Sequence, residues 1–177
     1  MAVMSESTIQ LLGRNFLRTL RKADLCPHYG PVLERSWMVI DDAVVLTGWY
    51  ESYHGDRAKF PATTDYEIAV NGRGIPDADL LQEGRELATT LLRRGAAFAW
   101  AALHEQHRRL PEMCMAAFVS ATPTLYDPNV FTGNVTFCRL HPGKPPYTDP
   151  ARTPAELVLP LTTNDCTVPM GCTPDLP

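Results

Sequence analysis

The strongest constraint on the fold is a helical pattern over residues 76–95, near the middle of the 177-residue chain. Apolar residues recur there three and four positions apart, which places them on one face of a helix. Acidic residues open the stretch, Arg93 and Arg94 close it, and Gly95 stands where helices often end. We therefore predict a core-facing helix with two adjacent apolar rows: Leu80, Gly84, Leu87 and Leu91, and Leu81, Ala88 and Leu92.

Short stretches rich in apolar and aromatic residues flank this helix on both sides and are typical of strands. Residues 37–40 and 43–47 flank Asp41 and Asp42, a pair suited to a two-residue turn, which predicts a β-hairpin. We expect its second strand to continue through Trp49 and Tyr50. Further strands are expected at residues 65–70, 113–121 and 130–140.

Two further segments carry helical signals. Residues 7–24 place Phe16 and Leu20 on one face and several arginines on another, which predicts an amphipathic helix. Residues 96–109 are ambiguous, because their alanines favour a helix whereas the alternation of Phe98 and Trp100 favours a strand. We expect a helix there, after a kink at Gly95.

The last part of the chain is rich in proline, with nine of the sixteen prolines between residues 142 and 177. Proline removes a backbone donor, so this segment is expected to supply neither a helix nor a central strand. We predict an α+β globular domain over residues 1–141 and an extended arm over 142–177. The domain is expected to have a single antiparallel sheet with the N-terminal amphipathic helix and the central helix packed on it.

Composition narrows the classes of function. The formal net charge of −4 disfavours a generally basic nucleic-acid binder. No apolar run is long enough to span a membrane, and the first residues lack the pattern of a signal peptide. We therefore expect a protein of the cytoplasm, or of a particle assembled inside the cell. Its five cysteines are odd in number, which favours reduced thiols.

One group of polar residues could carry catalysis. His54, Asp56 and Arg57 follow an expected strand, where a histidine and a carboxylate could transfer protons and the guanidinium could hold an anion. The sequence around them supplies no activated nucleophile, so an ordinary polar loop is the competing interpretation. No cofactor-binding pattern is present, and we expect no cofactor.

A second group could bind a metal. Cys26 and His28 form one loose pair and Cys138 and His141 another, and four such ligands can hold zinc. The closely spaced Cys-x-x-Cys pair of many zinc sites is missing, however. The competing interpretation is that the cysteines are buried core residues and the histidines lie at the surface.

The C-terminal arm contains an apolar patch that we expect to contact a partner. Its predicted anchors, with a further candidate at Tyr147, are Leu157, Val158, Leu159 and Leu161. Our leading hypothesis is thus a non-catalytic assembly or adaptor protein, such as a component of a virion or a secretion system. It would bind protein subunits, including further copies of itself. A small enzyme using the His54 loop and a Cys/His metal-stabilised binding module are the alternatives.

Overall fold

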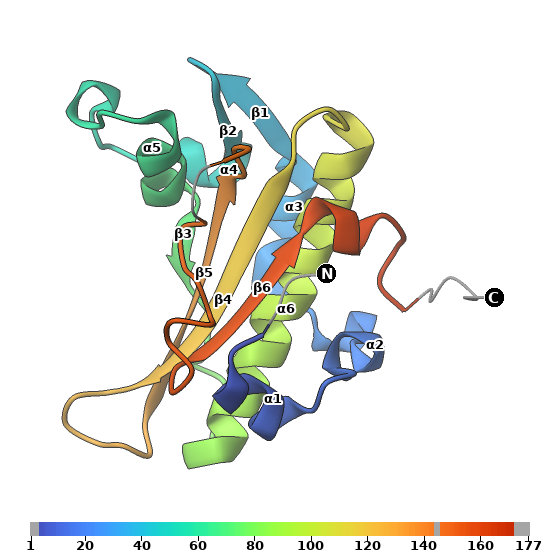
Figure 1. Cartoon of the computed structure of the whole chain (residues 1–177), viewed down its shortest axis with the longest axis vertical. Helices are drawn as coiled ribbons and strands as arrows, with labels where there is room; N and C mark the ends of the chain where they lie inside the picture. Colours follow the sequence, from blue (N-terminus) through green and yellow to red (C-terminus); the bar gives the residue numbers. More distant parts are fainter. Residues whose placement is uncertain (1–3, 144–145, 172–177) are drawn as a thin grey trace.

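The computed structural model describes residues 4–143 and 146–171 and shows an α+β fold (Figure 1). The expected fold class is confirmed, but the expected single sheet is wrong. A two-stranded hairpin, β1–β2, stands beside an antiparallel four-stranded sheet in the order β3-β5-β4-β6. The strands are β1 Trp37–Ile40, β2 Ala43–Leu46, β3 Gly72–Gly74, β4 Met115–Pro123, β5 Phe131–Arg139 and β6 Leu157–Thr162.

The helices precede, connect and cover these strands. The α-helices are α1 Glu6–Leu12, α2 Phe16–Thr19, α3 Gly30–Arg35, α4 Thr47–Tyr50, α5 Thr63–Val70 and α6 Gly84–Arg109. The 3-10 helices are η1 Lys22–Asp24, η2 Pro27–Tyr29, η3 Arg57–Lys59 and η4 Thr163–Cys166. The expected single helix over residues 7–24 is interrupted, because Gly13 ends α1 with a positive φ of 84°.

Helix α6 packs across one face of the four-stranded sheet (Figure 1). It starts later than the pattern predicted, and Leu81, placed in an apolar row, is 94% exposed in the preceding loop. It then continues through Gly95, so the helix expected over 96–109 is confirmed but Gly95 does not end the one before it. A Cβ at Gly95 would lie 2.5 Å from Val119 Cγ1 and 2.6 Å from Ile75 Cδ1. Glycine therefore permits close helix–sheet packing.

The expected hairpin is confirmed, with Asp41 and Asp42 at φ 46° and 64° in its turn. These left-handed angles fit the tight turns that join antiparallel strands. Its continuation through Trp49 and Tyr50 is wrong, because the chain enters α4 there. The strand expected at 65–70 is also wrong, because it lies in α5.

The proline-rich segment supplies a strand, but an edge strand and not the central one that its prolines were expected to exclude. Strand β6 pairs with β4 at the edge of the sheet, where its outer backbone groups need no neighbouring strand. The Ser5 N–H donates to the Val158 carbonyl at 3.1 Å, and the Thr162 N–H donates to the Asp165 carboxylate at 3.0 Å. Pro160 has no N–H to satisfy, which is why a proline is tolerated in an edge strand.

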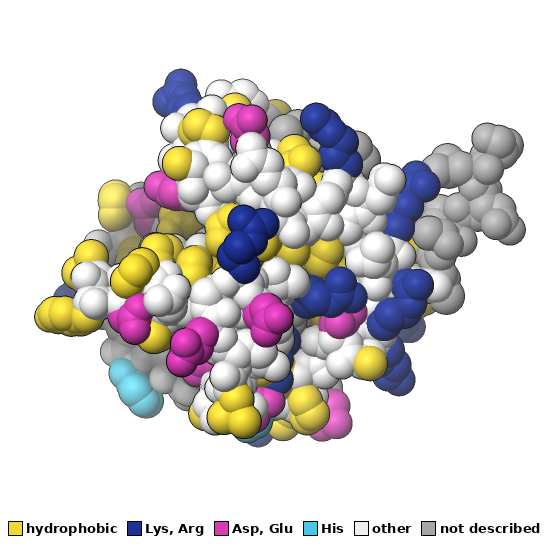
Figure 2. Space-filling model, turned by 90° about the horizontal axis from the view of Figure 1, so that it is seen from below, with side chains coloured by type: hydrophobic (Ala, Val, Ile, Leu, Met, Phe, Trp, Pro, Cys, Tyr) yellow, Lys and Arg dark blue, Asp and Glu magenta, His cyan; other side chains and the backbone are white. Residues whose placement is uncertain are grey.

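The β4–β5 turn and the start of α6 lie at the same end of the molecule (Figure 1). They are joined by a hydrogen bond of 2.6 Å from the Gly84 N–H to the Asn129 carbonyl. Figure 2 views the molecule from this end and shows hydrophobic side chains exposed between scattered charged ones. This end is therefore a surface on which apolar groups meet solvent.

Candidate functional site

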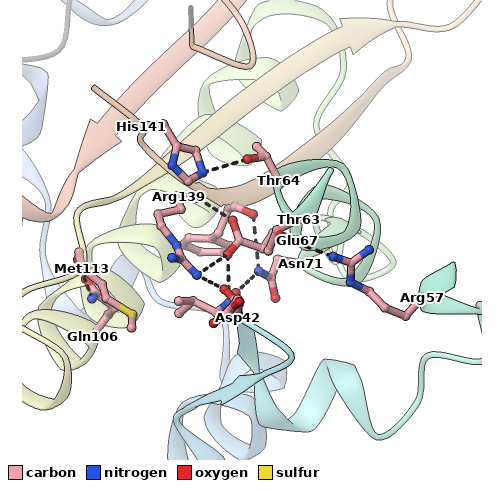
Figure 3. Close-up of polar contacts among 12 residues, drawn as sticks. Asp42, Arg57, Thr63, Thr64, Glu67, Asn71, Gln106, Met113, Arg139 and His141 are labelled. Atoms are coloured by element: carbon pink, nitrogen blue, oxygen red, sulfur yellow. Dashed lines mark hydrogen bonds and ion pairs between the residues drawn. The ribbon is translucent and has the colours of Figure 1, made fainter. Parts of the chain in front are cut away.

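A buried carboxylate connects the two sheets (Figure 3). Glu67, on α5, is fully buried and accepts hydrogen bonds of 2.8 Å from the Val44 and Arg139 backbone N–H groups. The Arg139 guanidinium pairs with the same carboxylate at 3.4 Å and also donates to the Asp42 carbonyl. The charge of Glu67 is thus compensated by donors from both sheets.

Asn71, one helical turn beyond Glu67, completes this connection. Its amide oxygen accepts from the Leu46 N–H at 3.0 Å, and its nitrogen donates to the Val44 carbonyl at 2.8 Å. The same nitrogen donates to the Phe137 carbonyl at 3.4 Å. Glu67 and Asn71 therefore satisfy the free edge of β2 and attach it to β5, which is a structural role.

A hollow of about 210 Å³ opens beside this junction. His141 Nε2 lies 3.1 Å from Thr64 Oγ1 there, and Cys138, Arg139 and Tyr147 also line the hollow. Burial, with the nearby Glu67 charge, raises the pKa of the Cys138 thiol to about 12. Because a protonated thiol is a weak nucleophile, Cys138 is poorly suited to covalent catalysis in this state.

The polar side chains of the His54 loop do not converge on one position. Asp56 accepts a hydrogen bond of 2.9 Å from the Ala58 N–H and caps η3. Arg57 donates to the Phe60 carbonyl at 2.9 Å and to Thr63 Oγ1 at 3.2 Å, and it stacks on a tyrosine ring of α5. His54 is exposed. Asp56 and Arg57 therefore both make local structural contacts in this loop.

The two Cys/His pairs considered for a metal lie in different parts of the fold. Cys26 Sγ lies 3.4 Å from His28 Nδ1, with the thiol in the core that contains α6. Cys138 belongs to a cluster on the opposite face of the sheet, and His141 contacts Thr64. Within residues 4–143 and 146–171, no group of three or more histidine, cysteine or acidic residues is placed to hold a metal.

Most of the predicted partner anchors are buried inside the chain's own fold. Val158 is 4% exposed, and Leu159 and Leu161 are 0% exposed. Leu157 is partly buried, and Tyr147 is 51% exposed with its ring edge-on to Phe118 at 5.6 Å. The expectation that Val158, Leu159 and Leu161 form an open contact patch is therefore wrong, because β6 uses them to complete the sheet and its core.

Large hydrophobic side chains are instead exposed at the end of the molecule that carries the β4–β5 turn. Leu125 and Tyr126 are each 99% exposed, and Leu81, in the loop before α6, is 94% exposed. Val130 is 41% exposed on the same turn. We call these four residues the apolar tip. The signal for it in the sequence is the Leu-Tyr pair between Pro123 and Pro128, in the segment that connects two expected strands.

The turn that carries Leu125 and Tyr126 is held by its own hydrogen bonds. Thr124 Oγ1 donates to the Asp127 carbonyl at 2.9 Å and accepts from the Asp127 N–H at 3.2 Å. The Asp127 carboxylate accepts from the Asn129 N–H at 2.8 Å. Because these bonds lie within the turn, Leu125 and Tyr126 are presented to solvent on an organised backbone.

An apolar groove of about 520 Å³ adjoins the apolar tip. Its walls come from α1, α6 and the ends of β4, β5 and β6. They include the apolar Leu11, Ala88, Ala121, Phe131 and Leu157, and the polar Ser7, Gln10, Arg85, Thr122 and Glu156. Arg85 is exposed and makes no ion pair with any residue that the structure describes. A more open hollow of about 420 Å³ shares Leu11 and Arg85 with this groove, so the guanidinium is accessible from both.

No family model, curated protein or solved structure matches this chain. Among the described residues, no helix combines the length and the apolar character needed to cross a membrane.

Proposed function

We propose that this chain is a non-catalytic assembly or adaptor protein that binds another polypeptide through the apolar tip and the adjoining groove. The carrying observation is the near-complete exposure of Leu125 and Tyr126 on an organised turn, beside a groove with apolar walls. Exposed apolar groups gathered beside a groove are typical of interaction surfaces, whereas singly scattered ones are not.

The residue types at this surface suit a binding hot spot. Tyrosine and arginine are enriched among residues that dominate binding energy, and Tyr126 and Arg85 lie at the tip and in the groove. Fully burying a large apolar side chain contributes roughly 1.5–3 kcal/mol before the costs of association. Leu81, Leu125 and Tyr126 together therefore supply a useful part of an interface.

The C-terminal segment contributes to this surface in a different way from the one we expected. Leu157 lines the groove, whereas the following residues of β6 pair with β4 and fix its position. In this proposal β6 is part of the scaffold that shapes the contact surface.

The proposal can be tested with a photo-cross-linking amino acid in place of Tyr126. In cells that make the protein, we expect a cross-linked polypeptide of defined mass. Leu125→Asp should abolish the product without lowering the melting temperature, because Leu125 is exposed. The same amino acid at Val39, which is 43% exposed on the β1–β2 hairpin, is the matched control. Equal cross-linking at both positions, or none at position 126, contradicts the proposal.

A further inference from the structure

We propose that the polypeptide bound by this surface is a second copy of the same chain, related by a two-fold axis. Each apolar tip would insert into the groove of the other copy. This inference rests on the proposed function and names its partner.

This end of the molecule carries a protruding turn and a groove side by side. Leu125 and Tyr126 project from the turn, while Pro123 and Phe131, at the two ends of that turn, already line the groove. A protruding element and a groove thus adjoin each other on one chain. With a two-fold axis between them, the turn of each copy inserts into the groove of the other, so the same contact forms twice. The commonest homodimers have such two-fold symmetry.

One charge beside the tip has an opposite charge in the groove. Asp127 follows Tyr126 directly and is exposed, whereas Arg85 lies in the groove without an ion pair among the described residues. Glu156 also lines the groove and would repel Asp127. Glu86 lines the neighbouring hollow and would repel it there too. We therefore assign the Asp127 contact to the Arg85 guanidinium itself, which is accessible from both cavities. Such complementarity fixes the register of a contact.

Pairing through β6, one of the two edge strands of the four-stranded sheet, is a poorer way to join two copies. On the outer side of β6, Ser5 occupies the backbone groups of Val158, and Asp165 occupies the Thr162 N–H. Pro160 offers no donor between them. Continuation of the sheet across two chains at β6 is therefore blocked, and insertion of side chains at the apolar tip remains open.

The first test is the size of the purified full-length chain, measured by sedimentation over a range of concentrations. We expect a dimer that Tyr126→Asp converts to a monomer, while the control Val39→Asp leaves it unchanged. Both substituted positions are exposed in the single chain, so both variants should remain folded, and Tyr126→Asp should lose only the stabilisation that dimerisation adds. A wild-type chain that is monomeric throughout overturns the inference, as does a dimer that Tyr126→Asp leaves intact.

The second test uses exchanged charges. Arg85→Asp and Asp127→Arg should each weaken dimerisation by about tenfold or more, because each places like charges together. An equimolar mixture should dimerise again, because both contacts then pair an aspartate with an arginine. Should Asp127→Arg disturb the turn, Asp127→Asn keeps the acceptor for the Asn129 N–H and should still weaken the dimer. Failure of the mixture to dimerise with both variants folded, or an unaffected Asp127→Asn dimer, overturns the inference.

These results also separate this inference from the proposed function. If the pure chain is monomeric but position 126 still cross-links to a polypeptide of different mass, the chain is an adaptor for another protein and the two-fold dimer is wrong. If the pure chain is monomeric and no specific cross-link forms, both proposals fail.

Discussion

At the scale of single residues, two polar side chains at α5 form the hydrogen bonds with β2 that a neighbouring strand would otherwise form. Glu67 and Asn71 bind the backbone groups that β2 leaves unpaired and attach them to β5. Nothing in the sequence distinguished this buried glutamate from a surface one, because its partners are backbone groups from distant parts of the chain. Its role follows from tertiary structure alone.

Replacing Glu67 with alanine should destabilise the protein by about 3 kcal/mol, because Arg139 and two buried N–H groups lose their acceptor. The measurement is the free energy of unfolding from urea titrations followed by circular dichroism. The matched control is Glu34→Ala in α3, where the side chain is exposed and the expected change is within about 0.5 kcal/mol. Equal losses for the two variants would show that the junction does not stabilise the fold.

The chemistry of single side chains also gave little indication of which residues form a functional surface. Reactive side chains made four residues candidates: His54, Asp56, Cys26 and Cys138. The type of a side chain does not show where it lies in the fold. The structure places Asp56 at a helix cap and Cys138 in a buried cluster. Leu125 and Tyr126 have ordinary apolar side chains, and only their exposure distinguishes them.

At the scale of elements, the sequence predicted well where periodicity and local propensity agreed. The β1–β2 hairpin and the two long strands β4 and β5 follow such stretches, whereas over 96–109 the helix propensity of alanine outweighed the alternation of Phe98 and Trp100. Residues 65–70 failed because Tyr66, Ile68 and Val70 alternate with other residues, which resembles a strand. In the structure, Tyr66, Glu67 and Val70 are buried on one face of a helix. A segment this short is compatible with both the helical and the strand periodicity.

Gly95 gives a prediction at this scale, because it sets the distance between α6 and the sheet. Gly95→Ala should raise helix propensity yet destabilise the protein by about 1–3 kcal/mol, since the added Cβ would meet Val119 and Ile75. Val119→Ala removes one of these contacts. The double variant should therefore lose less stability in thermal or urea unfolding than the sum of the two single variants. Additive losses, or a stabilised Gly95→Ala, would contradict close packing at this position.

At the scale of the whole molecule, the proline-rich segment is the largest difference between expectation and structure. Counting prolines predicted an arm outside the core, but a proline count does not show which backbone groups need partners. Pro160 lies between Leu159 and Leu161, which are fully buried, and faces the one side of the sheet edge where no donor is required. The sheet is completed only after the chain has passed the boundary we had predicted at residue 141.

The role of β6 gives the last prediction, which concerns whether this strand belongs to the chain that carries it. Leu161→Ala should reduce the free energy of unfolding by about 2–5 kcal/mol, because Leu161 is fully buried among residues of the same chain. Tyr147→Ala, at a position 51% exposed, should cost much less and is the control. Both should be measured by urea unfolding at two protein concentrations in a Tyr126→Asp background, which removes the dimer inferred above. An equal loss for Leu161→Ala at both concentrations is expected of an internal strand. A loss that depends on concentration would mean that β6 is exchanged between copies, and the arm would again be a contact element as the sequence first suggested.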